Sequence, residues 1–132
     1  MRVIKYIMVH CTASPITWGV ADLKNCFKQK GWSAPGYHFI VTHDGAIHQI
    51  HDIGLIANGC RGYNRNSIHV AWVGGQHGND NRTPQQIKGL FNIVAELKTK
   101  FPNSKIIGHN EVSFKLCPCF NCATEFARLQ SK

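Results

Sequence analysis

The sequence has few acidic residues. Its 132 residues include 7 Asp and Glu against 15 Lys and Arg, which gives a formal net charge of +8. A basic surface favours polyanionic partners such as nucleic acid, anionic lipid or an acidic cell wall, and it also serves solubility without any partner. Because the sequence contains neither a basic helix nor a sheet motif of interleaved aromatic and basic residues, we expect no nucleic-acid partner.

The sequence also lacks a hydrophobic run close to the roughly 20 residues that cross a bilayer, so we expect no membrane insertion. Residues 1–10 are too short and too charged for the apolar core of a signal peptide. We therefore expect synthesis in the cytoplasm, with any extracellular target reached by another route. No internal repeat, low-complexity tract or linker interrupts the chain, whose length suits one domain with one core.

A chain with 6 cysteines and no export signal is not typical of a disulfide framework. Cys11, Cys26 and Cys60 are scattered, which is typical of small buried hydrophobic residues. Cys119 and Cys122 belong to a cluster near the end of the chain, and we expect both to be partly buried beside the last helix.

Hydrophobic patterning predicts strands over 2–9, 37–41, 46–50, 67–73 and 105–107, and helices over 20–30, from Pro84 onward, and over 123–129. Asp44-Gly45 between two extended runs indicates a hairpin. Thr83 and Gln86 predict a capping box around Pro84. This order predicts a mixed α/β (α+β) fold, in which helices flank a central mixed sheet.

Three side chains can form a metal site if the ends of the predicted strands meet. His10 follows the first predicted strand, His109 follows the last one, and Cys117 comes 8 residues after His109. Two imidazoles and a thiolate suit zinc and leave a fourth position open for water or substrate, which favours catalysis over a structural role. Because the chain contains 8 histidines, this spacing alone does not select these residues.

Two other interpretations remain open at this point. Cys117, Cys119 and Cys122 look like half of a zinc ribbon or a redox pair, although the chain has neither a second ribbon pair nor the strand-to-helix setting of a thioredoxin motif. Cys11 beside His10 suggests a Cys-His nucleophile, but neighbouring residues of a strand point to opposite faces.

Five motifs follow one another along the chain: VHCTAS (9–14), GYHFI (36–40), GYNRNSI (62–68), GHNEV (108–112) and KLCP (115–118). In this order they resemble the type 2 N-acetylmuramoyl-L-alanine amidases, with the closest likeness to the small phage lysozyme-amidases. The wider superfamily includes the peptidoglycan-recognition proteins. The resemblance runs from about residue 3 to about residue 126, and five ordered motifs over that length are far more specific than any one of them.

The resemblance implies that His10, His109 and Cys117 ligate one zinc ion, and that Tyr37 and Lys115 are catalytic. It implies hydrolysis of the amide between the lactyl group of N-acetylmuramic acid and L-alanine of the peptidoglycan stem peptide. The family fold, a mixed sheet flanked by helices, agrees with the predicted element order. We expect residues 1–132 to be a single monomeric catalytic domain without a separate wall-binding domain, which acts on the wall after lysis or secretion.

The residue types suit that reaction. Zinc activates water and polarises a carbonyl, and the Lys115 ammonium suits the developing oxyanion. Tyr37 suits the orientation of water or the passage of a proton to the leaving amine. Glu111 is a candidate to hold a ligand imidazole, with a surface salt bridge as its simpler role.

The sequence departs from the family pattern at two places. Relatives often carry a histidine a few residues before the Gly-x-Asn motif, where this chain has Gly59, so stem-peptide preference or turnover is expected to differ. His69 falls in a strand where small or apolar residues are usual, and the sequence offers no function for it.

The main alternative to catalysis is a non-catalytic peptidoglycan-binding module, because several recognition relatives bind without cutting. Members that do not cut typically lack the cysteine ligand. The presence of Cys117 together with Tyr37 and Lys115 therefore favours an enzyme.

Overall fold

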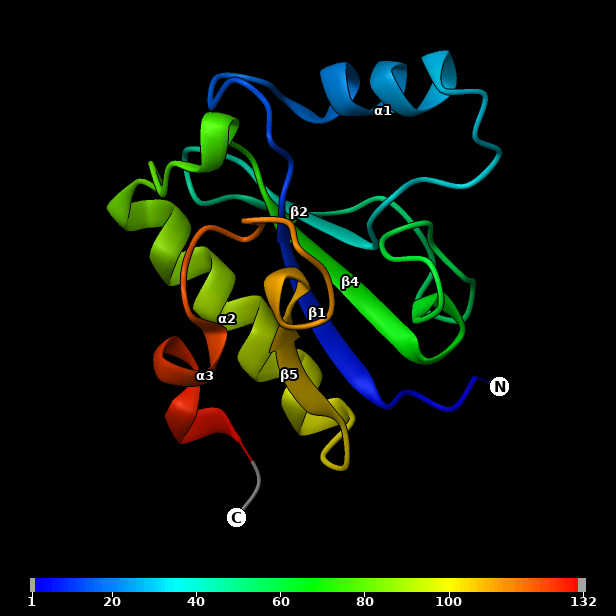
Figure 1. Cartoon of the computed structure of the whole chain (residues 1–132), viewed down its shortest axis with the longest axis vertical. Helices are drawn as coiled ribbons and strands as arrows, with labels where there is room; N and C mark the ends of the chain where they lie inside the picture. The colour runs from blue at the N-terminus through cyan, green and yellow to red at the C-terminus, as the bar shows by residue number, and fades with distance from the viewer. Residues whose placement is uncertain (1, 131–132) are drawn as a thin grey trace.

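Short segments rich in β-branched and aromatic residues build a sheet whose central strands are covered on both faces. The computed structural model describes residues 2–130 (Figure 1). Its strands are β1 (Tyr6–Cys11), β2 (Phe39–Val41), β3 (Ile47–Gln49), β4 (Ser67–Trp72) and β5 (Lys105–Gly108). They lie in the order β3-β2-β4-β1-β5, and only β3 is antiparallel to its neighbour. The nearly continuous burial of β1, β2 and β4 is typical of parallel strands that pack on both sides.

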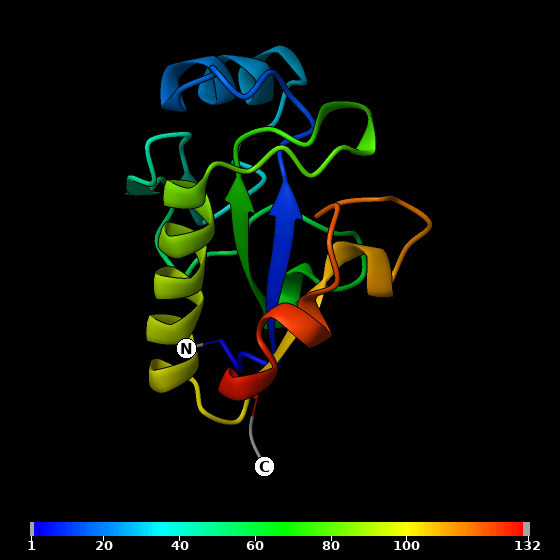
Figure 2. The same cartoon turned by 90° about the vertical axis from the view of Figure 1, so that its left-hand side faces the viewer.

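Helix α2 (Pro84–Lys100) covers one face of the sheet (Figure 2). It begins as predicted: the Thr83 side chain accepts a hydrogen bond from the Gln86 backbone N–H, and the Gln86 side chain accepts one from Thr83, each at 3.0 Å. Its apolar stripe packs on the odd-numbered residues of β1 and the even-numbered residues of β4. The short α3 (Cys122–Glu125) lies against β5 on the same side.

Helix α1 (Val20–Gln29) crosses the sheet near the carboxyl ends of β1 and β4 (Figure 2). Its buried residues Leu23 and Phe27 pack against Ile40 and Val73, which point away from α2. Loops, and not a helix, cover the rest of this second face. The even-numbered residues of β1, including His10, therefore face loops rather than a helix.

Two predicted elements differ from the structure by more than two residues at one end. The first strand was expected over 2–9 but begins at Tyr6 and continues through Cys11, because its partner β4 begins opposite Tyr6, directly after the 3-10 turn Asn64–Asn66. The last helix was expected over 123–129 but consists of α3 and a separate 3-10 turn over Ala127–Leu129. Phe126, fully buried against the α2 face, separates the two pieces.

The predicted architecture, a mixed central sheet flanked by helices, is confirmed. The hairpin around Asp44-Gly45 joins β2 to β3 as expected. Two further 3-10 turns, Gln76–Gly78 and His109–Glu111, follow β4 and β5. Among residues 2–130 no helix combines the length and apolar character needed to cross a membrane.

Candidate metal centre

The register of the sheet brings His10 and His109 together. Val9 of β1 pairs with Gly108 of the parallel strand β5, so the next residues, His10 within β1 and His109 directly after β5, lie side by side at the same end of the sheet. His10 is 1% exposed and His109 is 7% exposed. Their Nδ1 atoms lie 3.2 Å apart. The meeting of these two strand ends, expected from the sequence, is thus present in the structure.

Cys117 reaches the same point from the loop that follows β5. The backbone N–H of Cys11 donates to Cys117 Sγ at 3.1 Å. Trp72 Nε1 donates to the carbonyl oxygen of Pro118 at 3.1 Å, which fastens the next residue of the loop to β4. Arg82 makes a cation–π contact with a later residue of the loop, since its guanidinium lies 3.7 Å from the ring centroid of Phe120. The loop is therefore anchored at the cysteine and at the residues that follow it.

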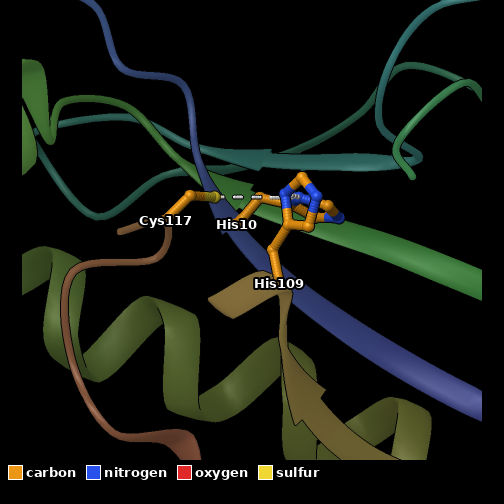
Figure 3. A group of neighbouring side chains, drawn as sticks. All are labelled: His10, His109 and Cys117. Carbon is orange, nitrogen blue, oxygen red and sulfur yellow. Dashed lines mark hydrogen bonds between the residues drawn. The ribbon is translucent and has the colours of Figure 1, made fainter. Parts of the chain in front are cut away.

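The three candidate ligands point toward one another (Figure 3). Cys117 Sγ lies 3.8 Å from His10 Nδ1, and the three ligand atoms all lie within 4.8 Å of one another. Tetrahedral zinc, with bonds of about 2.1 Å to nitrogen and 2.3 Å to sulfur, separates two nitrogens by about 3.4 Å and nitrogen from sulfur by about 3.6 Å. The donor set and its spacing therefore fit zinc with one open position.

The surroundings of the two imidazoles favour their neutral forms. Burial, followed by the nearby His69, His109 and Lys115, lowers the pKa of His10 well below its usual range. Burial and then Lys115 lower the pKa of His109. A neutral imidazole keeps a lone pair for a metal, so this environment suits ligands rather than cations.

Tyr37 and Lys115 lie on the same cavity as the three candidate ligands. The Tyr37 ring is 5.3 Å from the His10 ring, and its hydroxyl donates to the carbonyl oxygen of Cys11 at 3.4 Å. Burial, and then Cys117 and Cys11, raise the pKa of Tyr37, so the phenol keeps its proton at neutral pH. Lys115 is exposed, and its positive charge contributes to lowering the pKa of both His10 and His109.

The cavity has a volume of about 220 Å³ and adjoins a second one of about 560 Å³. Both are lined by Trp32, Asn58, Gly59, His109 and Lys115. The two hollows form a groove that passes the candidate ligands, with Arg61 and Asn64 on the side away from Cys117. A groove of this volume can hold part of a substrate beside the open position.

The other cysteines lie outside this cluster of ligand atoms. Within residues 2–130, the set His10, His109 and Cys117 is the one group of three His, Cys, Asp or Glu side chains near enough to share an ion. Cys11 points to the opposite face, as alternation predicts, and its Sγ lies 3.7 Å from that of half-buried Cys119. Cys122 is 1% exposed in the first turn of α3, more deeply buried than expected.

Glu111 holds neither ligand imidazole, and no ion pair forms on it within the described part of the chain. Its carboxylate accepts the Gly108 backbone N–H and so caps the turn that begins at His109. Both roles considered from the sequence are therefore wrong. The carboxylate instead fixes the backbone from which His109 leaves β5.

Sequence reasoning missed two residues next to the site. His69 of β4 is 0% exposed and contacts His10, and Asn64 contacts His69 from the other side. The only available signal was a histidine within a strand of otherwise small and apolar residues. Its relation to His10 depends on the register between β1 and β4, which the sequence alone does not reveal.

Comparison with known proteins agrees with the resemblance seen in the motifs. The profile of the family described as N-acetylmuramoyl-L-alanine amidase matches residues 1–120. The endolysin of Klebsiella phage KP32 is 36% identical over 121 residues, which cover 87% of this chain and 80% of the relative. The amidase LysC of Clostridium intestinale superposes with a TM-score of 0.85 at 26% identity, over 98% of this chain and 87% of its own.

Proposed function

Because this chain belongs to the N-acetylmuramoyl-L-alanine amidase family, we propose that it is a zinc-dependent amidase of bacterial peptidoglycan. The bond that it cuts joins the lactyl group of N-acetylmuramic acid to L-alanine of the stem peptide. The observation that carries this proposal is the convergence of His10, His109 and Cys117, with Tyr37 and Lys115 on the same cavity.

The proposed reaction adds water across the amide, with hydroxide to the carbonyl carbon and a proton to the nitrogen that leaves. His10, His109 and Cys117 would hold the zinc ion, which when bound would polarise the amide carbonyl and lower the pKa of water toward ~7. Cys117 would bind the ion as a thiolate and offset one unit of its charge, and the Cys11 N–H donates a hydrogen bond to this sulfur. The two neutral imidazoles complete the ligand set.

Lys115 stabilises the negative charge that develops on the substrate carbonyl oxygen. Its ammonium is exposed at the cavity, so it approaches the substrate from solvent and interacts more strongly once water is expelled. Tyr37, protonated at neutral pH, orients the attacking water and passes a proton toward the leaving amine. Each residue acts at an atom whose charge changes during the reaction.

The groove that runs from the metal centre toward Arg61 and Asn64 suits peptidoglycan as the partner, because it offers space for substrate groups next to the scissile amide. The protein acts as a monomer that is made in the cytoplasm and reaches the wall after lysis or secretion. Its charge of +8 attracts it to anionic wall polymers, and the strength of this attraction falls with salt.

Product analysis of digested peptidoglycan tests the reaction class. Purified protein is incubated with sacculi, and new amino termini are counted against new reducing sugar ends. The amidase releases peptides that begin with L-alanine and leaves the glycan strands intact. Reducing ends without released peptide would instead indicate a glycosidase, and binding to sacculi with no product would indicate a non-catalytic binding module.

A further inference from the structure

A fully buried histidine links the candidate ligand His10 to the polar side chain of Asn64. His69 Nδ1 lies 2.8 Å from His10 Nε2, and His69 Nε2 lies 2.8 Å from Asn64 Oδ1. His69 is 0% exposed, so no water competes for either of its ring nitrogens. The hydrogen-bonded series Asn64–His69–His10 thus ends at His10 Nε2, the ring nitrogen that faces away from the metal centre.

The orientation of the Asn64 amide fixes the direction of the first hydrogen bond in this series. Its Oδ1 also lies 2.7 Å from the backbone nitrogen of Cys60, which can only donate. The atom between Cys60 and His69 is therefore the amide oxygen, an acceptor. It follows that His69 Nε2 carries the hydrogen and donates it to Asn64.

The positions of the remaining protons follow in order along the hydrogen-bonded series from Asn64 to His10. A neutral His69 with hydrogen on Nε2 has a lone pair on Nδ1, which accepts the hydrogen of His10 Nε2. His10 then has its lone pair on Nδ1. That atom lies 3.2 Å from His109 Nδ1 and 3.8 Å from Cys117 Sγ, so the lone pair points at the position proposed for zinc.

We propose that His69 is a positioning residue which, held by Asn64, fixes His10 in the tautomer and orientation that present Nδ1 to zinc. The inference rests on the proposed function and assigns to this strand residue a role that its sequence position did not suggest. Partners that hydrogen-bond the distal nitrogen of a ligand imidazole commonly change metal affinity by about 10- to 100-fold. An imidazole serves here because it can accept from His10 and donate to Asn64 at once.

Gly59 makes room for this arrangement. A methyl group at position 59 would lie 2.6 Å from Cε1 of His69 and closer still to its Nδ1, which is nearer than carbon atoms approach in proteins. Any side chain at 59 therefore displaces the His69 ring from His10. The two departures from the family pattern, Gly59 and His69, belong to one feature of this chain.

The backbone of His69 is fixed independently of its ring. Its N–H donates to Nδ1 of the buried His38 at 3.0 Å, and residues 67–72 pair with β1 along the whole strand. Substitution of the side chain therefore leaves the strand in place. This allows the effect on the metal centre to be separated from an effect on folding.

The test compares two nearly isosteric variants, His69→Leu and His69→Asn. The asparagine oxygen replaces the acceptor at Nδ1, whereas leucine offers none. Zinc affinity, measured by competition with a chromogenic chelator, is expected to fall 10- to 100-fold in His69→Leu and only a few-fold in His69→Asn. His43→Asn, on the exposed hairpin, serves as the control and leaves zinc affinity unchanged.

A spectroscopic readout separates positioning from a structural role. In the metal-free protein, long-range ¹H–¹⁵N correlations of His10 are expected to show hydrogen on Nε2 in the wild type and in His69→Asn, and a mixture of tautomers in His69→Leu. Equal zinc affinity and equal tautomers in all three proteins overturn the inference. A wild type that binds no zinc instead overturns the proposed function.

A double-mutant cycle tests the coupling to Gly59. Gly59→Ala is expected to weaken zinc binding in the wild type, because the methyl group displaces the His69 ring. In a His69→Ala background the same change has little further effect. An equal loss in both backgrounds would show that position 59 acts on the metal centre without His69, and it would contradict the coupling.

Discussion

Val9 and Gly108 pair in parallel register, and this single pairing places His10 and His109 side by side at one edge of the sheet. The Nδ1 atoms of the two histidines lie 3.2 Å apart although 99 positions separate them in the sequence. Both imidazoles are positioned by strands, since His10 lies in the buried β1 and His109 directly follows β5. Only Cys117 comes from a loop, and that loop is anchored to β4 by the Trp72 hydrogen bond.

Replacement of the sulfur ligand should separate metal binding from folding. Cys117→Ser is expected to weaken zinc binding by more than about 100-fold and to reduce hydrolysis to background, because neutral hydroxyl is a poor zinc ligand. The serine oxygen can still accept the Cys11 N–H, so the melting temperature in chelator should change little. Cys26→Ser, on α1, is the matched control. Full activity of Cys117→Ser would remove this residue from the centre.

Lys115→Ala should reduce turnover far more than zinc occupancy. We expect kcat/KM to fall by about 10²- to 10³-fold, as for the loss of one donor to a developing oxyanion. Zinc content by elemental analysis should stay near that of the wild type. Lys88→Ala removes an exposed lysine from α2 and controls for the change in net charge. If Lys115→Ala lost metal in proportion to activity, the oxyanion role would have no support.

Tyr37→Phe removes one oxygen and keeps the ring that packs near His10. We expect kcat to fall by about 10²-fold, the scale of general acid-base contributions, with unchanged zinc affinity. Tyr6→Phe, whose ring packs on Tyr63, controls for loss of a phenol elsewhere. Unchanged kcat in Tyr37→Phe would leave only a packing role for this residue.

The buried His38 should make stability depend on pH. Burial is the main cause that lowers its pKa to about 4, whereas an unfolded histidine titrates near 6.5. Between these values the unfolded chain binds more protons than the folded one, so the free energy of unfolding falls as pH drops from about 6.5 to about 4. Above 6.5 the stabilisation is fully present.

Urea unfolding in chelator at pH 7, 5.5 and 4.5 measures this effect. His38→Asn should lower the free energy of unfolding at pH 7 by about 2 kcal/mol, because it loses buried hydrogen bonds to the His69 N–H and the Leu55 carbonyl. The free energy of unfolding of this variant should also fall less steeply toward acid pH than that of the wild type. An equally steep fall in both proteins would contradict the role of His38. Burial lowers the pKa of His69 to about 3, and that contribution remains in both proteins.

Much of the fold was predictable because local chemistry decides it. The capping box of Thr83 and Gln86 marks the start of α2, and Asp44-Gly45 marks the hairpin. Both signals act within a few residues. The ends of β1 were less predictable, since they depend on where β4 begins and not on the residues of β1 itself.

The site was predictable only in part. Family motifs selected His10, His109 and Cys117, and the structure brings these residues together. His69 and Gly59 were visible only as departures from a pattern. Their meaning depends on the pairing of Met8 with His69, which puts the His69 ring on the same face as His10, and on a loop that brings Gly59 over that ring. Such long-range register leaves no mark in a single sequence.

The most direct test of the central claim is mass analysis of peptidoglycan digested with and without a chelator. We expect the wild type to release stem peptides with free amino-terminal L-alanine. In chelator we expect no such product, and we expect release to recover when zinc is added in excess. Peptide release that persists in chelator, from protein shown to hold no metal, would contradict the zinc-dependent mechanism.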